Sequence, residues 1–274
     1  RGGKPDGVDT LTNIRFVQFS DTTLDLAALV NDTSRVVDGY IAGATVFRDT
    51  NNNGILDLGE VFTISADDGS FVLDGTGPLV ATGGIDTSTG LPFNLKLTAS
   101  SGDVLSPLTT LIDRMTAQGI ADAEAVLAGA LGLAAGVGIY GFDPLSASVL
   151  GDEQGTQLLA AGIQIASTAN LIAASLVGTG AGAQTIGDEA LTAIAAQFAQ
   201  GAVDFTDADV LTTLVNETAS MASVTTDAAF VANAGFVIAG VNAALALEAA
   251  GQGEQGGSAL ALAKISAVAQ TNVA

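Results

Sequence analysis

The feature that most constrains the fold is a change in composition near residue 105. Residues 1–105 hold six of the eight basic residues, together with most of the turn-forming and β-branched residues. Residues 115–263 contain no Lys or Arg, and their many Ala residues recur with scattered acids at helical spacing. The change predicts an α+β chain in two parts, strands first and helices afterwards.

The strand-rich part divides into two segments. Residues 1–35 are predicted to be a strand-and-turn segment, because residues 14–19 alternate apolar and polar side chains. Residues 36–105 alternate short apolar runs with Asp-, Gly- and Pro-containing turns, which predicts a small antiparallel β-sandwich. Its expected strands cover residues 42–47, 61–65, 70–73, 79–82 and 93–99.

Residues 106–274 are predicted to form an all-α, Ala-rich helical bundle. Ser106 is suited to the N-cap of the first helix and Pro107 to its first turn, and apolar residues follow at spacings of three and four. Small side chains allow such helices to approach closely. Further helices are expected at residues 121–134, 152–177, 187–200, 206–222, 226–250 and 257–270.

The charge and the missing residue types exclude several function classes. The chain has no His and no Cys, so it has no catalytic site, zinc site or disulfide that needs either residue. Its net charge of -21 repels phosphate, so we expect no nucleic-acid partner. Residues 158–177 and 228–250 are nearly uncharged, but they are rich in Ala, Gly and polar residues and lack basic flanks. We therefore expect no transmembrane segment.

One motif carries specific chemistry. Residues 49–60 read D-T-N-N-N-G-I-L-D-L-G-E, which matches the D-x-[DN]-x-[DN]-G-x5-E pattern of a calcium loop. A glycine at position 54 allows the sharp turn, and hard oxygen donors at alternating positions suit Ca²⁺ better than the smaller Mg²⁺. The predicted ligands are Asp49, Asn51, Asn53, the carbonyl of Ile55, Asp57 and Glu60. The alternative is an Asn- and Gly-rich hairpin that binds no metal.

The segments that flank this loop read as strands, whereas an EF-hand has helices there. The loop, with V-F-R before it and A-D-D-G-S-F at residues 66–71, resembles the calcium-binding B-type repeats (SdrD-like and Cna-B-like sandwiches) of bacterial surface proteins. The resemblance covers about residues 38–100. Some such repeats carry a Lys isopeptide crosslink, and Lys96 is the candidate here, although no partner motif accompanies it.

Two further segments suggest where the protein works. Residues 7–21 resemble the strand that follows the last glycine-rich repeat of RTX-type calcium-binding proteins, although no complete repeat is present. Residues 82–93 and 105–111 are similar to a module of very large type I-secreted proteins. These resemblances imply an extracellular or cell-surface location in a bacterium. The absence of Cys agrees with such export, and no signal peptide is recognisable at residue 1.

These observations predict a calcium-stabilised structural or adhesive portion of a secreted bacterial surface protein. Adhesion, biofilm formation and surface-layer or filament assembly are the expected roles, with other copies of the chain or other surface components as partners. One alternative is a module that binds a ligand or partner through the helical bundle. A less favoured alternative is a carboxylate-based hydrolase, since we expect no enzyme, no catalytic residue and no cofactor other than Ca²⁺. Its candidate acid pairs are Asp67 with Asp68, Asp152 with Glu153, Asp188 with Glu189, and Asp207 with Asp209.

Overall fold

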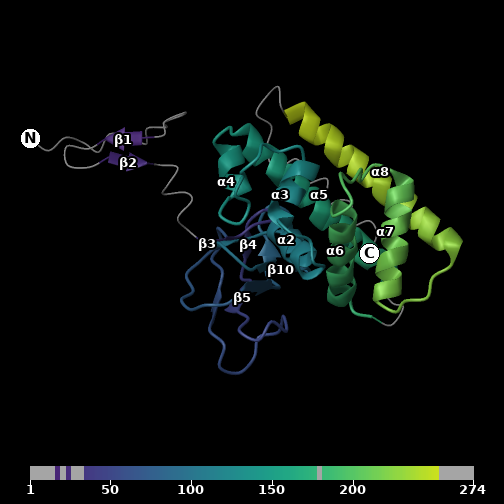
Figure 1. Cartoon of the computed structure of the whole chain (residues 1–274), viewed down its shortest axis with the longest axis horizontal. Helices are drawn as coiled ribbons and strands as arrows, with labels where there is room; N and C mark the ends of the chain where they lie inside the picture. The colour runs from purple at the N-terminus through teal and green to yellow at the C-terminus, as the bar shows by residue number, and fades with distance from the viewer. Residues whose placement is uncertain (1–15, 19–22, 26–33, 178–180, 253–274) are drawn as a thin grey trace, which may run out of the picture.

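The computed structural model describes residues 16–18, 23–25, 34–177 and 181–252. In these residues the strands occupy the N-terminal part and seven helices follow (Figure 1). The change of pattern near residue 105 therefore predicts the order of the two kinds of structure correctly. The predicted helix at residues 257–270 lies outside the described residues, as does most of the segment 1–35.

The largest sheet is antiparallel and has the strand order β10-β8-β5-β6. Val46, Ala81 and Leu97 face one another across three of its strands and are all buried. Phe47 and Val80, which pair on the other face of the sheet, are also buried, so the central strands are covered on both sides. The four strands are β5 (Thr45–Arg48), β6 (Phe62–Ile64), β8 (Leu79–Thr82) and β10 (Lys96–Ala99).

A second, three-stranded sheet has the order β11-β3-β7. β11 pairs with β3 in parallel, which departs from a purely antiparallel arrangement. A parallel pair needs a long crossover, and here the crossover is the rest of the β-region, which separates β3 from β11 in the sequence. The strands are β3 (Ser34–Val36), β7 (Ser70–Phe71) and β11 (Val104–Leu105).

Two smaller antiparallel pairs complete the described strands. β4 (Ile41–Ala42) pairs with β9 (Ile85–Asp86), and β1 (Phe16–Gln18) pairs with β2 (Thr23–Asp25). The predicted strand at residues 42–47 is divided between β4 and β5, because Gly43 lies between them with a φ of +71°. β3, β9 and β11 have no sequence prediction, since two or three residues are too short to show a period.

The helices agree with the predicted spans, with shifted ends. α6 starts four residues earlier than expected, and the short helix α4 begins at Pro144, as the Asp143-Pro144 pair predicts. The helices are α2 (Pro107–Ala117), α3 (Ala123–Ala130), α4 (Pro144–Val149), α5 (Glu153–Leu176), α6 (Ala183–Phe198), α7 (Ala208–Met221) and α8 (Ala228–Gln252).

Side-chain caps explain where several helices begin. Ser106 and Thr109 form a reciprocal capping box at the start of α2, as the Ser106-Pro107 pair predicts. Asp143, Asp152 and Asp207 accept backbone N–H hydrogen bonds at the starts of α4, α5 and α7. Many of the acids in the helical part therefore satisfy N–H groups that the helix itself leaves unpaired.

One continuous hydrophobic core runs through both parts. It extends from Val36 in β3 through Leu97 in β10 and Leu111 in α2 to the helices α5, α6 and α7. Two buried threonines of α2 also bond β10: Thr110 Oγ1 accepts from Thr98 N at 2.9 Å, and Thr109 Oγ1 donates to Thr98 O at 2.8 Å. The division into units at 36–105 and 106–274 stays a prediction, and the structure adds that these parts share a core across residue 105.

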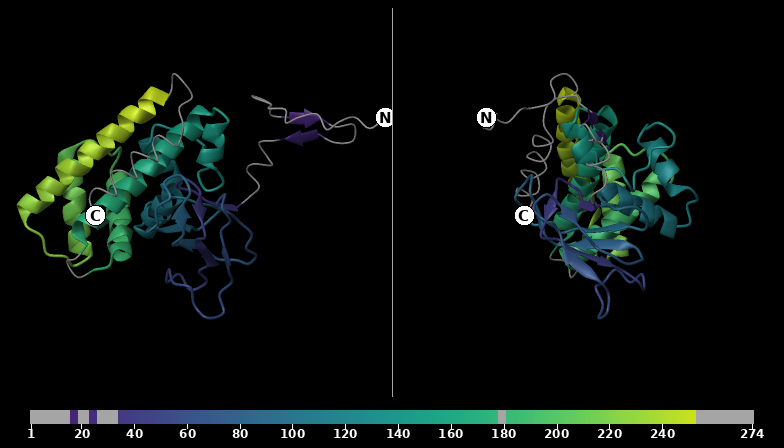
Figure 2. Two further views of the ribbon diagram at one scale, coloured as in Figure 1. Left: turned by 180° about the vertical axis from the view of Figure 1, so that it is seen from behind. Right: turned by 90° about the vertical axis from the view of Figure 1, so that its left-hand side faces the viewer.

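α8 lies along the outer edge of the bundle, across α5 and α7 (Figure 2). Within the described residues, two helices are long and apolar enough to cross a membrane by length and composition: α5 and the Ala228–Leu247 part of α8. In α5, 67% of the most apolar window is buried in the protein, whereas in α8 only 33% is buried. α5 thus has the burial of a core helix, and α8 is covered on one side.

If the shared core couples the two parts, removing the α2–β10 hydrogen bonds should weaken both at once. We expect Thr110→Val to lower the free energy of unfolding by about 1–3 kcal/mol, because the partly buried N–H of Thr98 loses its side-chain acceptor. Thr110→Ser keeps the hydroxyl and should cost clearly less. Denaturant unfolding followed by circular dichroism and by hydrogen exchange of β-strand amides measures this. Loss of the strands at a lower denaturant concentration than the helices would contradict the coupling.

Candidate functional site

The predicted calcium loop connects two paired strands. β5 ends at Arg48, the loop occupies residues 49–60, and β6 begins at Phe62. β5 and β6 pair antiparallel, so the loop is the connection of a hairpin. The prediction that strands flank the loop is confirmed, and an EF-hand arrangement of two helices is absent here.

Asp49 anchors the start of the loop. Asp49 is only 4% exposed to solvent, and its backbone N–H donates to Pro78 O at 2.9 Å. Its two carboxylate oxygens accept from Asn53 N at 3.1 Å and from Gly54 N at 2.6 Å. Gly54 has a φ of +71°, which a glycine adopts without strain, so the sharp turn predicted at this position is present.

Asp57 is the point on which the two predicted asparagine ligands converge. Its Oδ2 accepts from Asn51 Nδ2 at 2.7 Å and from Asn53 Nδ2 at 2.6 Å. The hydrogen bonds from Asn51 and from Asn53 favour the ionised carboxylate and lower the pKa of Asp57. The carboxylate is therefore charged over the whole neutral range, as a calcium ligand must be.

Glu60 closes the loop. One of its oxygens accepts from Thr50 N at 2.7 Å and from Thr50 Oγ1 at 3.0 Å, and the other accepts from Asp57 N at 3.0 Å. The backbone hydrogen bonds from Asp57 and Thr50 lower the pKa of Glu60. Glu60, the last predicted ligand, is thus held over the loop by hydrogen bonds from Thr50 near the start of the loop and from Asp57 near its end.

The donor chemistry of the loop fits a hard cation, but the side chains have other partners in this conformation. The Oδ1 atoms of Asn51 and Asn53 accept from the backbone N–H groups of Asn53 and Ile55. Their amide nitrogens face Asp57, so binding an ion would require these amides to turn their oxygens inward. Among the described residues, no three His, Cys, Asp or Glu side chains are close enough together to hold a metal. Ile55 has an exposed side chain.

A cleft of about 410 Å³ lies between the loop and α2. Lys96 in its wall bonds Asp188 of α6, with 2.9 Å between Nζ and Oδ2, and Arg114 approaches the same carboxylate at 3.6 Å. Asp188 therefore connects the loop side of the β-region to the bundle. Sequence reasoning did not pair Lys96 with Asp188, because 92 positions separate them.

One member of each acid pair considered for a hydrolase has a structural partner. Asp68 bonds Ser70 and Arg35, Asp188 holds the two basic residues just described, and Asp152 and Asp207 cap helices. Asp143, which precedes Pro144, caps α4 and also accepts from Tyr40 Oη at 3.0 Å. Each of these carboxylates has an identified role in holding the fold.

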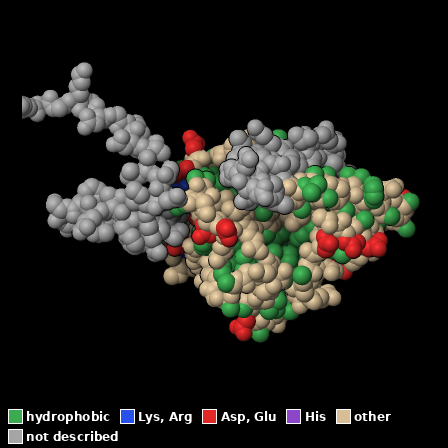
Figure 3. Space-filling model, turned by 90° about the horizontal axis from the view of Figure 1, so that it is seen from above, with side chains coloured by type: hydrophobic (Ala, Val, Ile, Leu, Met, Phe, Trp, Pro, Cys, Tyr) green, Lys and Arg blue, Asp and Glu red, His purple; other side chains and the backbone are tan. Residues whose placement is uncertain are grey.

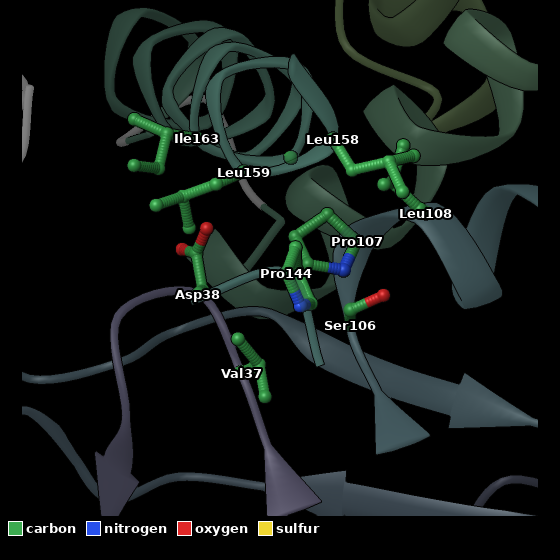
Figure 4. Close-up of a pocket in the computed structure, with 10 residues that line it drawn as sticks. Val37, Asp38, Ser106, Pro107, Leu108, Pro144, Leu158, Leu159 and Ile163 are labelled. Carbon is green, nitrogen blue, oxygen red and sulfur yellow. The ribbon is translucent and has the colours of Figure 1, made fainter. Parts of the chain in front are cut away.

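One acid with an enclosed carboxylate oxygen was not singled out from the sequence. Asp38 follows β3, and its side chain points toward a cavity of about 10 Å³ whose walls include Leu159, Ile163 and Pro144 (Figure 4). The residue as a whole is half-buried, but its Oδ1 is fully enclosed and has no hydrogen-bond partner. Burial, and then the nearby charge of Asp86, raise the pKa of Asp38 well above its usual value.

Comparison with known proteins adds no assignment, because no family model, no curated protein and no solved structure matches the chain.

The raised pKa of Asp38 predicts a pH-dependent cost. The carboxyl group of Asp38 holds its proton more tightly in the folded state than in the unfolded state. The protonated group therefore contributes to the free energy of unfolding at low pH, and this contribution is lost as pH rises through the folded pKa. We expect Asp38→Asn to increase the melting temperature relative to wild type, by more at pH 8 than at pH 4. Thermal melts in EDTA measure this, with the exposed Asp103→Asn as control. A gain in melting temperature that does not change with pH would contradict it.

Proposed function

We propose that this chain is a calcium-stabilised structural or adhesive portion of a secreted bacterial surface protein. The observation that carries the proposal is the loop at residues 49–60. Its sequence puts five oxygen-bearing side chains in the connection of a β-hairpin, and the amides of Asn51 and Asn53 contact the carboxylate of Asp57. Asp49, Asn51, Asn53, Asp57 and Glu60 would hold the ion, with the carbonyl of Ile55 as a sixth donor.

Calcium would act through linkage between binding and folding. An ion that binds only the folded loop adds about 2.7 kcal/mol of stability when its concentration is 100 times the dissociation constant. Binding in the loop would also stabilise the sheet, because Asp49 is buried at the base of the loop and its N–H is hydrogen-bonded to Pro78 beside β8. The ion would also reduce the mutual repulsion of three carboxylates within twelve residues.

The finer architecture belongs to the same proposal. In a B-type sandwich two sheets pack face to face, and the chain has a four-stranded and a three-stranded sheet in this region. Val46 from the first sheet and Val36 and Phe71 from the second belong to the same hydrophobic cluster. This shared cluster favours a small sandwich whose calcium loop lies in a hairpin of the larger sheet.

Surface features favour assembly over catalysis. β6 is an edge strand of the larger sheet, and its Phe62 and Ile64 are more than half exposed. An exposed apolar edge is a site at which other chains or surface components can pair. The extracellular location rests on the sequence resemblances and on the loop, which would be filled where calcium is abundant.

A binding module is the second candidate, favoured by the cleft beside the loop. That cleft lies between the β-region and α2, whereas the sequence-based alternative places the ligand on the helical bundle. Lys96 and Arg114 in its wall are both directed to Asp188. A ligand there would therefore compete with Asp188 for the positive charge.

Calcium should raise the melting temperature of the full chain, with about one ion bound per molecule. Glu60→Gln should remove most of that increase. Because Glu60 also bonds Thr50 and Asp57, the quantity to compare is the difference between melts in calcium and in EDTA, not the melting temperature itself. Differential scanning calorimetry and native mass spectrometry measure the two effects.

Asp103→Asn is the matched control, since it removes one exposed carboxylate outside the loop. It should leave the calcium-dependent increase unchanged. Equal melting temperatures in calcium and EDTA, with no bound ion by mass spectrometry, would refute the proposal. An equal increase with magnesium would show that the loop is not selective for calcium.

A further inference from the structure

The helix α8 has two apolar seams on opposite sides. The inner seam is buried against α5 and α7: Asn242 donates to Thr168 of α5 at 2.9 Å, and a Cβ at Gly235 would collide with the backbone of Thr212 in α7. The outer seam faces away from the protein. Its members are Phe230, Asn233, Val237, Gly240, Ala244 and Leu247.

The outer seam has the spacing of a helix-pairing surface. Its successive members are separated by three, four, three, four and three residues, which is the a/d pattern of a coiled coil. Leu247 is 75% exposed and Val237 is 51% exposed. Nothing lies within 4 Å of a Cβ built on Gly240, so the middle of the seam is open. Figure 3 shows hydrophobic side chains gathered on this side of the molecule, in the right-hand part of the view.

We propose that the outer seam of α8 pairs with the same seam of a second copy of this chain, in antiparallel orientation. The spacing of the seam reads the same in both directions, so a two-fold axis between residues 238 and 239 brings every member opposite another member. Phe230 then meets Leu247 of the second copy, Asn233 meets Ala244, and Val237 meets Gly240. The largest side chains meet at the two ends, and the central glycine leaves room for valine.

The distribution of charge favours a second copy over a lipid surface. The Ala228–Leu247 part of α8 contains no charged residue, in a chain whose net charge is -21. Residues 115–263 contain no Lys or Arg, so the helix lacks the basic groups that bind anionic headgroups. Two copies of so acidic a chain repel each other, and contact through a surface without charge adds least to that repulsion. Salt at ~0.15 M screens it beyond about 8 Å.

The size of the seam sets the expected affinity. Twenty helical residues span about 30 Å. Pairing two such helices buries on the order of 1,000 Å² in total, which is the lower limit for a specific interface. We therefore expect a reversible dimer with a dissociation constant in the micromolar range, which strengthens when the salt concentration is raised. This inference does not depend on calcium binding, and the dimer should form in EDTA as well.

Sedimentation velocity of the full chain at roughly 1 to 200 µM, in calcium and in EDTA, tests the dimer. Ala244→Lys places a charge in the seam and should reduce dimerisation at least tenfold. Ala246→Lys places the same charge two residues away, at an exposed position outside the seam, and should have little effect. Both alanines are solvent-exposed, so both variants should keep the wild-type circular dichroism spectrum.

Engineered disulfides test the orientation, because the chain contains no Cys. Phe230→Cys mixed with Leu247→Cys should give a crosslinked dimer under mild oxidation, and each variant alone should give much less. Strong crosslinking of each variant alone would contradict antiparallel pairing. A full chain that stays monomeric at 200 µM would overturn the inference. So would dimerisation unaffected by Ala244→Lys, or a monomer that floats with phosphatidylcholine–phosphatidylglycerol vesicles.

Discussion

The packing of α2 against β10 is the interaction on which the rest of the structure depends. The strands of the β-region have only two to four residues each, too few to form a stable unit from their own hydrogen bonds. α2 supplies the missing apolar surface through Leu108, Leu111 and Met115, which are all fully buried. Its Thr109 and Thr110 also bond both backbone groups of Thr98. The helices that follow extend the same core, so strands and bundle stabilise each other.

The excess of acids over bases is the second constraint, and nearby backbone N–H groups stabilise many of the carboxylates. Carboxylates are placed where backbone N–H groups can bond them, at the starts of α4, α5 and α7 and inside the loop at residues 49–60. Two further acids join segments that are far apart in the sequence: Asp188 holds Lys96 and Arg114, and Asp143 accepts from Tyr40 and lies 3.4 Å from Arg35. The outer surface of α8 is without charge for a different reason, because residues 228–247 contain no charged side chain.

The elements that could be predicted from the sequence are those with a local physical cause. Apolar spacing of three and four residues predicts six of the helices, the Ser106-Pro107 pair predicts the start of α2, and the oxygen pattern predicts a turn at Gly54. β3, β9 and β11 are not predicted, because two or three residues are too few to show a period. The partnership of Lys96 with Asp188 and the burial of Asp38 could not be predicted either, since both depend on segments far apart in the sequence.

The sequence by itself determined the order of strands and helices, the residue types of the loop and the lack of His and Cys chemistry. These properties depend on composition and on neighbours within one or two turns of chain. Only the tertiary structure decided that one core crosses residue 105, that β11 pairs in parallel with β3, and which side of α8 is left uncovered. α8 is apolar all round in its sequence, so no pattern within the helix could distinguish its sides. Packing against α5 and α7 buries one seam of α8 and leaves the other exposed to solvent.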